Sequence, residues 1–300
     1  MGSPLRLTTV GLGSSAARRA WAIVQADVER TECALSRWRT DSALSMLNLT
    51  AGSDEPMQVE RRLYQALSAS ARAQRLTGGR FDPRVIGRLE ALGEHGPVRL
   101  PCIDARGTEP WLVRDPRAET VRLAAPVDSG GIGKGLALRW AADAVVRGGL
   151  AGRGLLVDAG GDLLARGIGP DGPGWRIGIE DPSGGEDPLA VIEVSGGAVV
   201  TSSTAVRNWE APDGRAVHHL IDPSGGEPGG GGLRAVSIAA PDPAWAEVWS
   251  KALFLGGPRQ IGDEARRRGM AAWWIEPDGT LHMSPAARAL TVWTREEAAA

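Results

Sequence analysis

The sequence predicts an α+β protein. Segments of helical length, with apolar residues at helical spacing, come early in the chain. The region after residue 150 consists of short apolar runs separated by turn signals, a pattern that is typical of an antiparallel sheet. Helices that precede a run of strands favour α+β over a regular doubly wound fold. With 42% hydrophobic and 23% charged residues among 300, the composition excludes a largely disordered chain.

The first part of the chain predicts one strand and two helices. The strand covers 5–11, the first helix runs from about residue 14 to Trp38, and the second covers 60–76. The Pro- and Gly-rich stretch 93–118 predicts a loop or a variable insertion.

After residue 125 the sequence predicts a sheet with flanking helices. A glycine-rich turn at 128–135 opens a helix that ends near Gly148, and later helices cover 243–255 and 258–268. A final hairpin strand closes the chain. The predicted strands are 154–158, 162–165, 175–179, 189–194, 197–201, 217–221, 234–240 and 272–275.

Charge and apolar patterning exclude several classes of partner. The 34 basic and 36 acidic residues give a net charge of −2, which predicts no nucleic-acid partner. No uncharged apolar run approaches the ~20 residues of a membrane helix, so no membrane span is expected. The first residues show no signal peptide, which predicts a cytoplasmic protein and leaves open a leader upstream of Met1. Cys33 and Cys102 form no metal or redox motif.

Lysine is unusually rare. Of the 34 basic residues, 32 are arginine, and the two lysines are Lys134 and Lys251. A crowded pocket that needs a compact positive charge accepts lysine more readily than the broad guanidinium of arginine. The alternative is that each lysine lies on a solvated face and has no role.

Three motifs could carry chemistry. Residues 128–135 (DSGGIGKG) join an extended segment to a helix, where backbone N–H groups favour an anion, although the spacing is not that of a P-loop. Residues 157–162 (VDAGGD) place two carboxylates around a glycine pair; a structural turn is the alternative. His218 and His219 would point to opposite faces of a strand, so only one can serve a given site as general base. A surface histidine is the alternative there.

Together these motifs resemble the ApbE family of FAD:protein FMN transferases. The resemblance covers nearly the whole chain, with the motifs in the family's order. They are 1–3 (MGS), 35–38 (LSRW), 42–48 (SALSMLN), 78–83 (GGRFDP), 128–135 (DSGGIGKG), 159–162 (AGGD), 201–203 (TSS), 219–223 (HLIDP) and 246–247 (AE) followed by Lys251.

The resemblance implies a two-lobed ApbE-like fold, mostly antiparallel sheet with flanking helices, with FAD in a cleft between the lobes. It implies a single domain over 1–293 and a disordered tail over 294–300. The implied reaction transfers FMN from FAD to a Thr or Ser hydroxyl of an acceptor flavoprotein, releases AMP and uses Mg²⁺.

The resemblance also assigns site residues. His219 would be the general base, and Lys134 would neutralise phosphate charge. The positions that hold Mg²⁺ in the family are Gly131, Glu247 and Lys251 here. The residues expected to contact FAD are Met1, Trp38, Arg80, Phe81, Asp82, Asp128, Lys134, Asp162 and Ile221.

The sequence departs from the family's pattern at the metal-binding positions. Glu247 replaces an aspartate and keeps a carboxylate, but Lys251 replaces a threonine, and an ammonium has no lone pair to give a metal. We therefore expect an altered and weakened Mg²⁺ site. Two alternatives stay open: an FAD pyrophosphatase that releases FMN and AMP, and a flavin-binding protein without activity.

Overall fold

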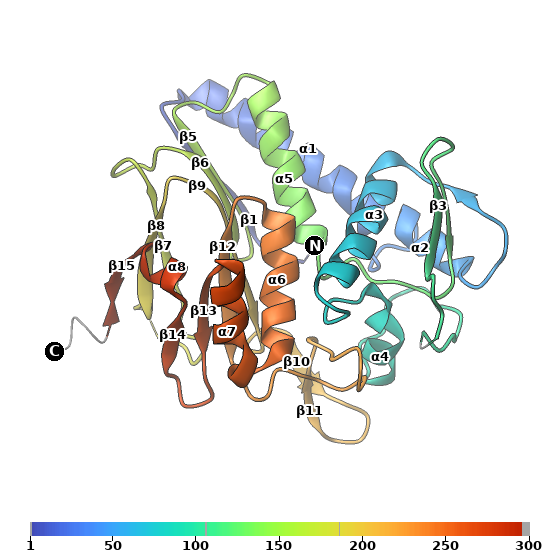
Figure 1. Cartoon of the computed structure of the whole chain (residues 1–300). Helices are drawn as coiled ribbons and strands as arrows, with labels where there is room; N and C mark the ends of the chain where they lie inside the picture. Colours follow the sequence, from blue (N-terminus) through green and yellow to red (C-terminus); the bar gives the residue numbers. More distant parts are fainter. Residues whose placement is uncertain (1, 106, 186, 296–300) are drawn as a thin grey trace. The chain divides into compact units, whose positions relative to one another are not determined.

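The structure is a computed structural model that describes residues 2–105, 107–185 and 187–295 (Figure 1). Helices combine with strands that pair antiparallel throughout the described residues, which confirms the α+β class. The elements are β1 (Leu5–Val10), α1 (Ser14–Leu35), α2 (Ala43–Leu49), β2 (Met57–Gln58), α3 (Arg61–Leu76), the 3-10 turn η1 (Pro83–Val85), α4 (Ile86–Ala91), β3 (Leu112–Asp115), β4 (Thr120–Leu123), α5 (Gly133–Arg147), β5 (Gly154–Ala159), β6 (Asp162–Gly167), β7 (Trp175–Ile179), β8 (Ala190–Val194), β9 (Gly196–Ser203), β10 (Asn208–Glu210), β11 (Ala216–His218), β12 (Ala235–Ala240), α6 (Pro243–Gly256), α7 (Pro258–Arg268), β13 (Ala271–Ile275), β14 (Leu281–Met283), α8 (Pro285–Arg288) and β15 (Thr291–Thr294).

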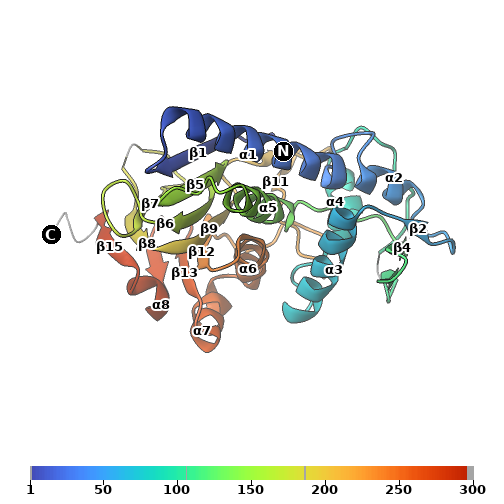
Figure 2. The same ribbon diagram turned by 90° about the horizontal axis from the view of Figure 1, so that it is seen from above.

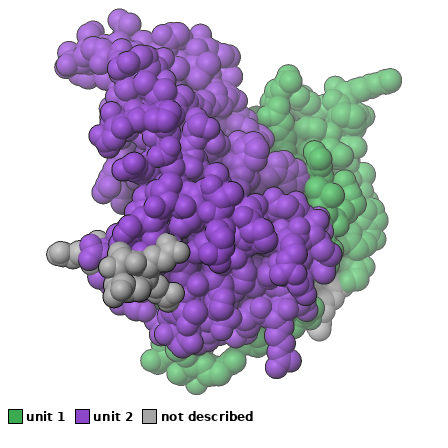
Figure 3. All heavy atoms as spheres, turned by 60° about the vertical axis from the view of Figure 1, so that its left-hand side comes forward, with its two compact units in different colours: residues 1, 28–133, 208–228 green, residues 2–27, 134–207, 229–300 purple. Residues whose placement is uncertain are grey.

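The chain divides into two compact units (Figure 3). Within the described residues, unit 1 comprises 28–133 and 208–228, and unit 2 comprises the remainder. The expected single domain over 1–293 stays a prediction.

Unit 2 is built on a seven-stranded sheet in the order β1-β5-β6-β9-β12-β13-β14. Alternate residues of β13 face opposite ways, as the pleat requires. Trp273 enters a core shared with the three-stranded sheet β15-β8-β7, together with Ile177 and Ile192. Helix α6 packs on β9 and β12, and helix α7 packs beside α6 (Figure 2). Trp274 faces α7, where a Cβ on Gly262 would lie 3.5 Å from its ring.

Unit 1 combines α2, α3, α4 and the small sheet β2-β4-β3 with the hairpin β10–β11. The hairpin belongs to unit 1 although the chain segment before it, 134–207, belongs to unit 2. Val217 of the hairpin packs with Leu89, Leu92 and Ile221 in one apolar cluster. Asn48 of α2 fixes the segment that precedes the glycine-rich turn. Its side chain donates to the Val127 carbonyl at 2.8 Å and accepts from the Val127 N–H at 2.9 Å.

Several predicted boundaries differ from the structure. The strand predicted over 217–221 ends at His218, because the chain turns there. The loop predicted over 93–118 contains β3, whose pairing with β4 sequence patterning did not reveal. The tail was expected from residue 294, but Thr294 ends β15 and Arg295 pairs with Asp181 at 2.9 Å; 296–300 lie outside the described residues. No helix in the described part of the chain is long and apolar enough to cross a membrane.

Candidate functional site

Lys134 is the first of the expected site residues in unit 2. It is the second residue of α5, and its ammonium forms an ion pair with Asp162 at the start of β6. Asp162 also accepts the Thr201 N–H at 3.2 Å. Burial alone would lower the pKa of Lys134, but the Asp162 and Glu247 carboxylates outweigh burial, and the pKa is raised. Lys134 is therefore a stable positive charge whose side chain remains 30% exposed.

Glu247 lies on α6 with its side chain fully buried. Its Oε2 accepts the N–H of Gly135, the third residue of α5, at 2.8 Å. A carboxylate in this position satisfies one of the N–H groups that a helix leaves unpaired and complements the positive end of the helix dipole. The two helices approach so closely that a Cβ on Gly135 would lie 2.5 Å from the Cα of Ala244. Gly135 is thus required for the Glu247 contact.

Lys251 lies one turn after Glu247 on α6. Its Nζ is 3.3 Å from Glu247 Oε1, and its side chain is 15% exposed. Burial raises the pKa of Glu247, while the charges of Lys251 and Lys134 act in the opposite direction. We call Lys134, Asp162, Glu247 and Lys251 the lysine–carboxylate cluster. It combines two ammonium groups with two carboxyl groups, and both lysines of the chain belong to it.

The residues expected to hold Mg²⁺ do not fit that ion. Both oxygens of Glu247 are engaged, Oε2 by the Gly135 N–H and Oε1 by the Lys251 ammonium. Lysine donates three N–H bonds and offers no lone pair to a metal. Among the residues that the structure describes, no group of three or more His, Cys, Asp or Glu could hold a metal ion. The contact of the Lys251 ammonium with Glu247 Oε1 agrees with the expectation of an altered metal site, since Lys251 offers no ligand oxygen.

The aromatic residues expected at the flavin differ in exposure. Trp38 is 50% exposed, and the Arg37 guanidinium lies over its ring at 4.2 Å. Phe81 is 5% exposed and packs against Gly131, where an added Cβ would come 2.5 Å from its ring. Trp38 can present a face to a ligand, whereas Phe81 supports the backbone of the glycine-rich turn. Arg80 donates from Nε to the Thr77 carbonyl at 3.3 Å.

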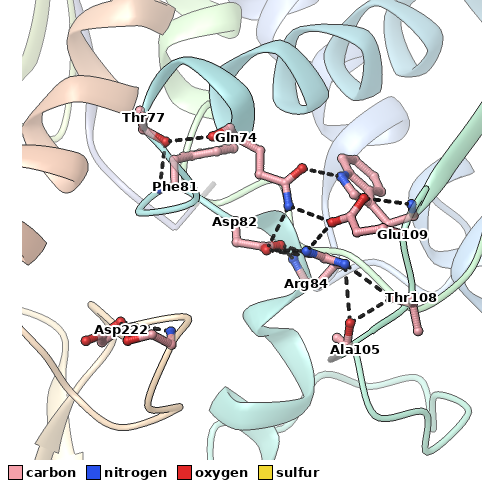
Figure 4. Close-up of polar contacts among 11 residues, drawn as sticks. Gln74, Thr77, Phe81, Asp82, Arg84, Ala105, Thr108, Glu109 and Asp222 are labelled. Carbon is pink, nitrogen blue, oxygen red and sulfur yellow. Dashed lines mark hydrogen bonds and ion pairs between the residues drawn. The ribbon is translucent and has the colours of Figure 1, made fainter.

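The carboxylates expected to contact FAD from unit 1 are both held by local bonds. Asp128 Oδ1 accepts the Gly130 N–H at 2.9 Å, and its Oδ2 lies 3.7 Å from Arg37 Nε. Asp82 caps η1 and pairs with the Arg84 guanidinium at 2.7 Å. Gln74 donates to Asp82 at 3.1 Å and connects it to Glu109 (Figure 4). Any ligand contact from Asp82 therefore competes with an existing ion pair.

A cavity of about 570 Å³ opens in unit 1 beside this network. That volume is within the range of small-molecule sites. It is bordered by Asp82 and Pro223, which belong to two of the motifs, and by Ile86, Pro101, Ile103 and Pro126. The network of Arg84, Gln74 and Glu109 was not predicted; an arginine directly after the Asp82-Pro83 pair is its only sequence signal.

The two histidines lie at the end of the β10–β11 hairpin. His218 is the last residue of β11, and its Nδ1 accepts the Leu220 N–H at 3.2 Å. His219 follows at a bend and is partly buried. Because His219 lies outside β11, the predicted alternation across a strand was wrong as a way to distinguish the two histidines. The hydrogen bond that His218 accepts from the Leu220 N–H distinguishes them instead. Ile221 is buried in the apolar cluster of unit 1.

The structure brings some expected residues together and separates others between units. Unit 2 gathers Lys134, Asp162, Glu247 and Lys251. Met1 lies outside the described residues. Unit 1 holds Trp38, Arg80, Phe81, Asp82, Asp128, Gly131, His219 and Ile221.

Comparison with known proteins identifies the family. The ApbE family model matches residues 1–274. An FAD:protein FMN transferase of Treponema pallidum is 33% identical over 286 residues, covering 86% of this chain and 77% of the relative. One from Klebsiella pneumoniae is 28% identical, covering 97% and 87%.

Solved structures agree. The ApbE protein of Thermotoga maritima superposes with a TM-score of 0.82 at 26% identity, covering 96% of both chains. The apo flavinyl transferase ApbE of Pseudomonas stutzeri gives 0.79 at 27% identity, covering 97% of this chain and 94% of the other. With a family model that spans most of its length and relatives that match nearly all of it, this chain belongs to the ApbE family.

Proposed function

We propose that this protein is an FAD:protein FMN transferase, which moves FMN from FAD to a Thr or Ser hydroxyl of an acceptor flavoprotein. Relatives that carry this name match nearly the whole chain. The observation that carries the proposal is the lysine–carboxylate cluster at the start of α5. It combines Lys134, a buried carboxylate and a helix N-terminus, and these features support a pyrophosphate-binding role for the motif that the family resemblance assigns to FAD.

The proposed step breaks the pyrophosphate bond of FAD. The acceptor hydroxyl oxygen attacks the phosphorus of the FMN half, the bond to the bridging oxygen breaks, and AMP leaves with that oxygen. His219 takes the hydroxyl proton as general base. Negative charge grows on the leaving phosphate, and a fixed cation nearby lowers the barrier.

Lys134 is suited to that stabilising role. Its raised pKa keeps it protonated at neutral pH, and its ammonium is partly exposed. The positive charge of Arg207 also acts on Lys134. Fixed ammonium groups beside a helix N-terminus favour a phosphate group over a neutral ligand.

We propose three kinds of contribution to FAD binding. Trp38 stacks on one ring system, because half of its surface is open. Asp128 and Arg80 provide polar contacts, and the buried Asp162 acts through its ion pair with Lys134. Asp82 contributes where a ligand replaces part of its pair with Arg84, and the buried Phe81 and Ile221 support the surrounding backbone. We expect the acceptor to be cytoplasmic.

A matched pair of histidine variants tests the proposal. The protein is incubated with FAD and an acceptor domain that carries the target threonine, and covalent flavin and AMP are both measured. We expect His219→Ala to lose covalent transfer while it still binds FAD, and His218→Ala to keep most transfer. The reverse ranking would contradict the assignment.

The same assay separates the alternatives. Covalent flavin together with AMP supports the transferase. FMN and AMP without covalent flavin would indicate a pyrophosphatase, and FAD binding with neither product would indicate a flavin-binding protein. An acceptor with alanine in place of the target threonine is the control for non-specific labelling.

A further inference from the structure

Both lysines of this arginine-rich chain lie beside one buried carboxylate. Of the 34 basic residues, 32 are arginine, and Lys134 and Lys251 both act electrostatically on Glu247. A guanidinium is broad and planar, whereas an ammonium is a compact point charge. Lys134 directly precedes Gly135, which nearly touches Ala244 of α6, and the Lys251 side chain is 15% exposed, so both positions favour the compact cation.

The Lys251 ammonium lies next to Oε1 of the Glu247 carboxylate. Its Nζ is 3.3 Å from Oε1, while Oε2 is held by the Gly135 N–H at 2.8 Å. The carboxylate is fully buried, so it requires a positive partner to remain ionised. A divalent ion at Oε1 would have to displace the ammonium, and the two positive charges would repel one another.

We propose that the Lys251 ammonium is a built-in cation that replaces a divalent metal at Glu247. This inference rests on the proposed function for its catalytic consequence: Lys251 and Lys134 together supply charge to the pyrophosphate of FAD, and no Mg²⁺ is needed at Glu247. The disagreement between the expected metal ligands and the residues present thus reflects an exchange of one cation for another. Asp162 and Glu247 hold the two ammonium groups in place.

Metal binding by the free protein tests the exchange without any catalytic assay. Mn²⁺ is titrated into the full chain in the absence of FAD, and free Mn²⁺ is followed by its paramagnetic resonance signal. We expect no saturable site at Glu247 in the parent. Lys251→Thr should gain one site per chain, competed by Mg²⁺, and the double variant with Glu247→Gln should lose it again.

A charge-matched control separates site creation from a general loss of positive charge. Arg259→Thr removes one exposed cation from α7 and should gain no Mn²⁺ site. Mg²⁺ should raise the melting temperature of Lys251→Thr and leave the parent and Arg259→Thr unchanged, because a ligand stabilises only the protein that binds it. If Lys251→Thr fails to fold, Lys251→Gln keeps a donor for Glu247 and serves in its place.

The rate of FMN transfer in the presence of EDTA then tests the catalytic consequence. We expect the parent to keep its rate within about threefold in EDTA, and Lys251→Thr to lose at least about tenfold and recover with Mg²⁺. A parental Mn²⁺ site that Glu247→Gln removes, or no new site in either Lys251 variant, would overturn the inference. Parental activity abolished by EDTA and restored by Mg²⁺ would do the same. If the parent forms no product with or without Mg²⁺, the proposed function fails, while the Mn²⁺ titration still decides the inference.

Discussion

Gly135 is the position where a single methyl group should disturb both the fold and the site. An added Cβ would lie 2.5 Å from the Cα of Ala244 and closer still to the Pro243 carbonyl oxygen. Ordinary contact requires roughly 3.4–4 Å, so the backbones of α5 and α6 must separate by about 1 Å. Overpacking of this kind costs about 1–3 kcal/mol. The same movement weakens the Gly135 N–H bond to the Glu247 carboxylate, and a bond to a charged group contributes about 1.5–3 kcal/mol.

We therefore expect Gly135→Ala to lower the free energy of unfolding by roughly 3–5 kcal/mol, a large part of the about 5–15 kcal/mol of a typical domain. Urea denaturation of parent and variant measures it. Gly262→Ala is the matched control. It makes the same change within helix α7, where the Cβ meets only the Trp274 ring at 3.5 Å, and should stabilise by about 0.5–1 kcal/mol. If Gly135→Ala proves as harmless as Gly262→Ala, the close approach of α5 and α6 is refuted.

Three further predictions concern other parts of the chain. Asn48→Ala leaves the Val127 N–H and carbonyl without their buried partner and should cost roughly 2–4 kcal/mol in urea denaturation. The chain's other asparagine, Asn208, is exposed, so Asn208→Ala should cost less than Asn48→Ala. Trp38→Ala should raise the Kd for FAD, measured by flavin fluorescence, without lowering the melting temperature; an unchanged Kd would remove Trp38 from the site. The raised pKa of Lys134 means that its ion pair stabilises fully below its ordinary value of 10.5 and is lost as pH rises through the higher folded value. The stability advantage of the parent over Lys134→Met should therefore stay constant from neutral pH to about 10.5 and decline as pH rises from there to the folded value, and a decline near neutral pH would contradict the shift.

The order of elements was predictable because it depends on local patterning. Apolar spacing and glycine-rich turns place most helices and strands of unit 2 within one or two residues of their observed bounds. The short elements of unit 1, such as α2 and β3, were missed. They are stabilised by distant partners: β3 by pairing with β4, and α2 by the bonds of Asn48 to Val127. Local sequence carries little trace of such contacts.

The candidate site was predictable in residue type more than in residue role. Motif order placed Lys134, Asp162 and Glu247 in one site, and the structure brings these three together. Roles depended on packing that no motif encodes. Phe81 was expected at a ring system and instead supports Gly131, since its exposure is decided by a neighbour fifty residues away. His218 and His219 are distinguished by a backbone bond, not by the strand alternation that the sequence indicated.

Glu247 connects the stability of the protein to its chemistry. One of its oxygens caps α5 through Gly135, and the other holds Lys251, so the carboxylate cannot change without affecting both. A protein that relied on exchangeable Mg²⁺ at this position would leave Oε1 of the buried Glu247 without a bound cation whenever the ion dissociated, at a cost of several kcal/mol. A covalently attached ammonium never dissociates. It carries one charge instead of two, and this makes the contribution of Lys134 to the same pyrophosphate more important than it would be beside a divalent ion. Loss of Lys134 should accordingly reduce turnover more in the parent than in Lys251→Thr supplied with Mg²⁺, and equal losses in the two backgrounds would show that the charges act independently.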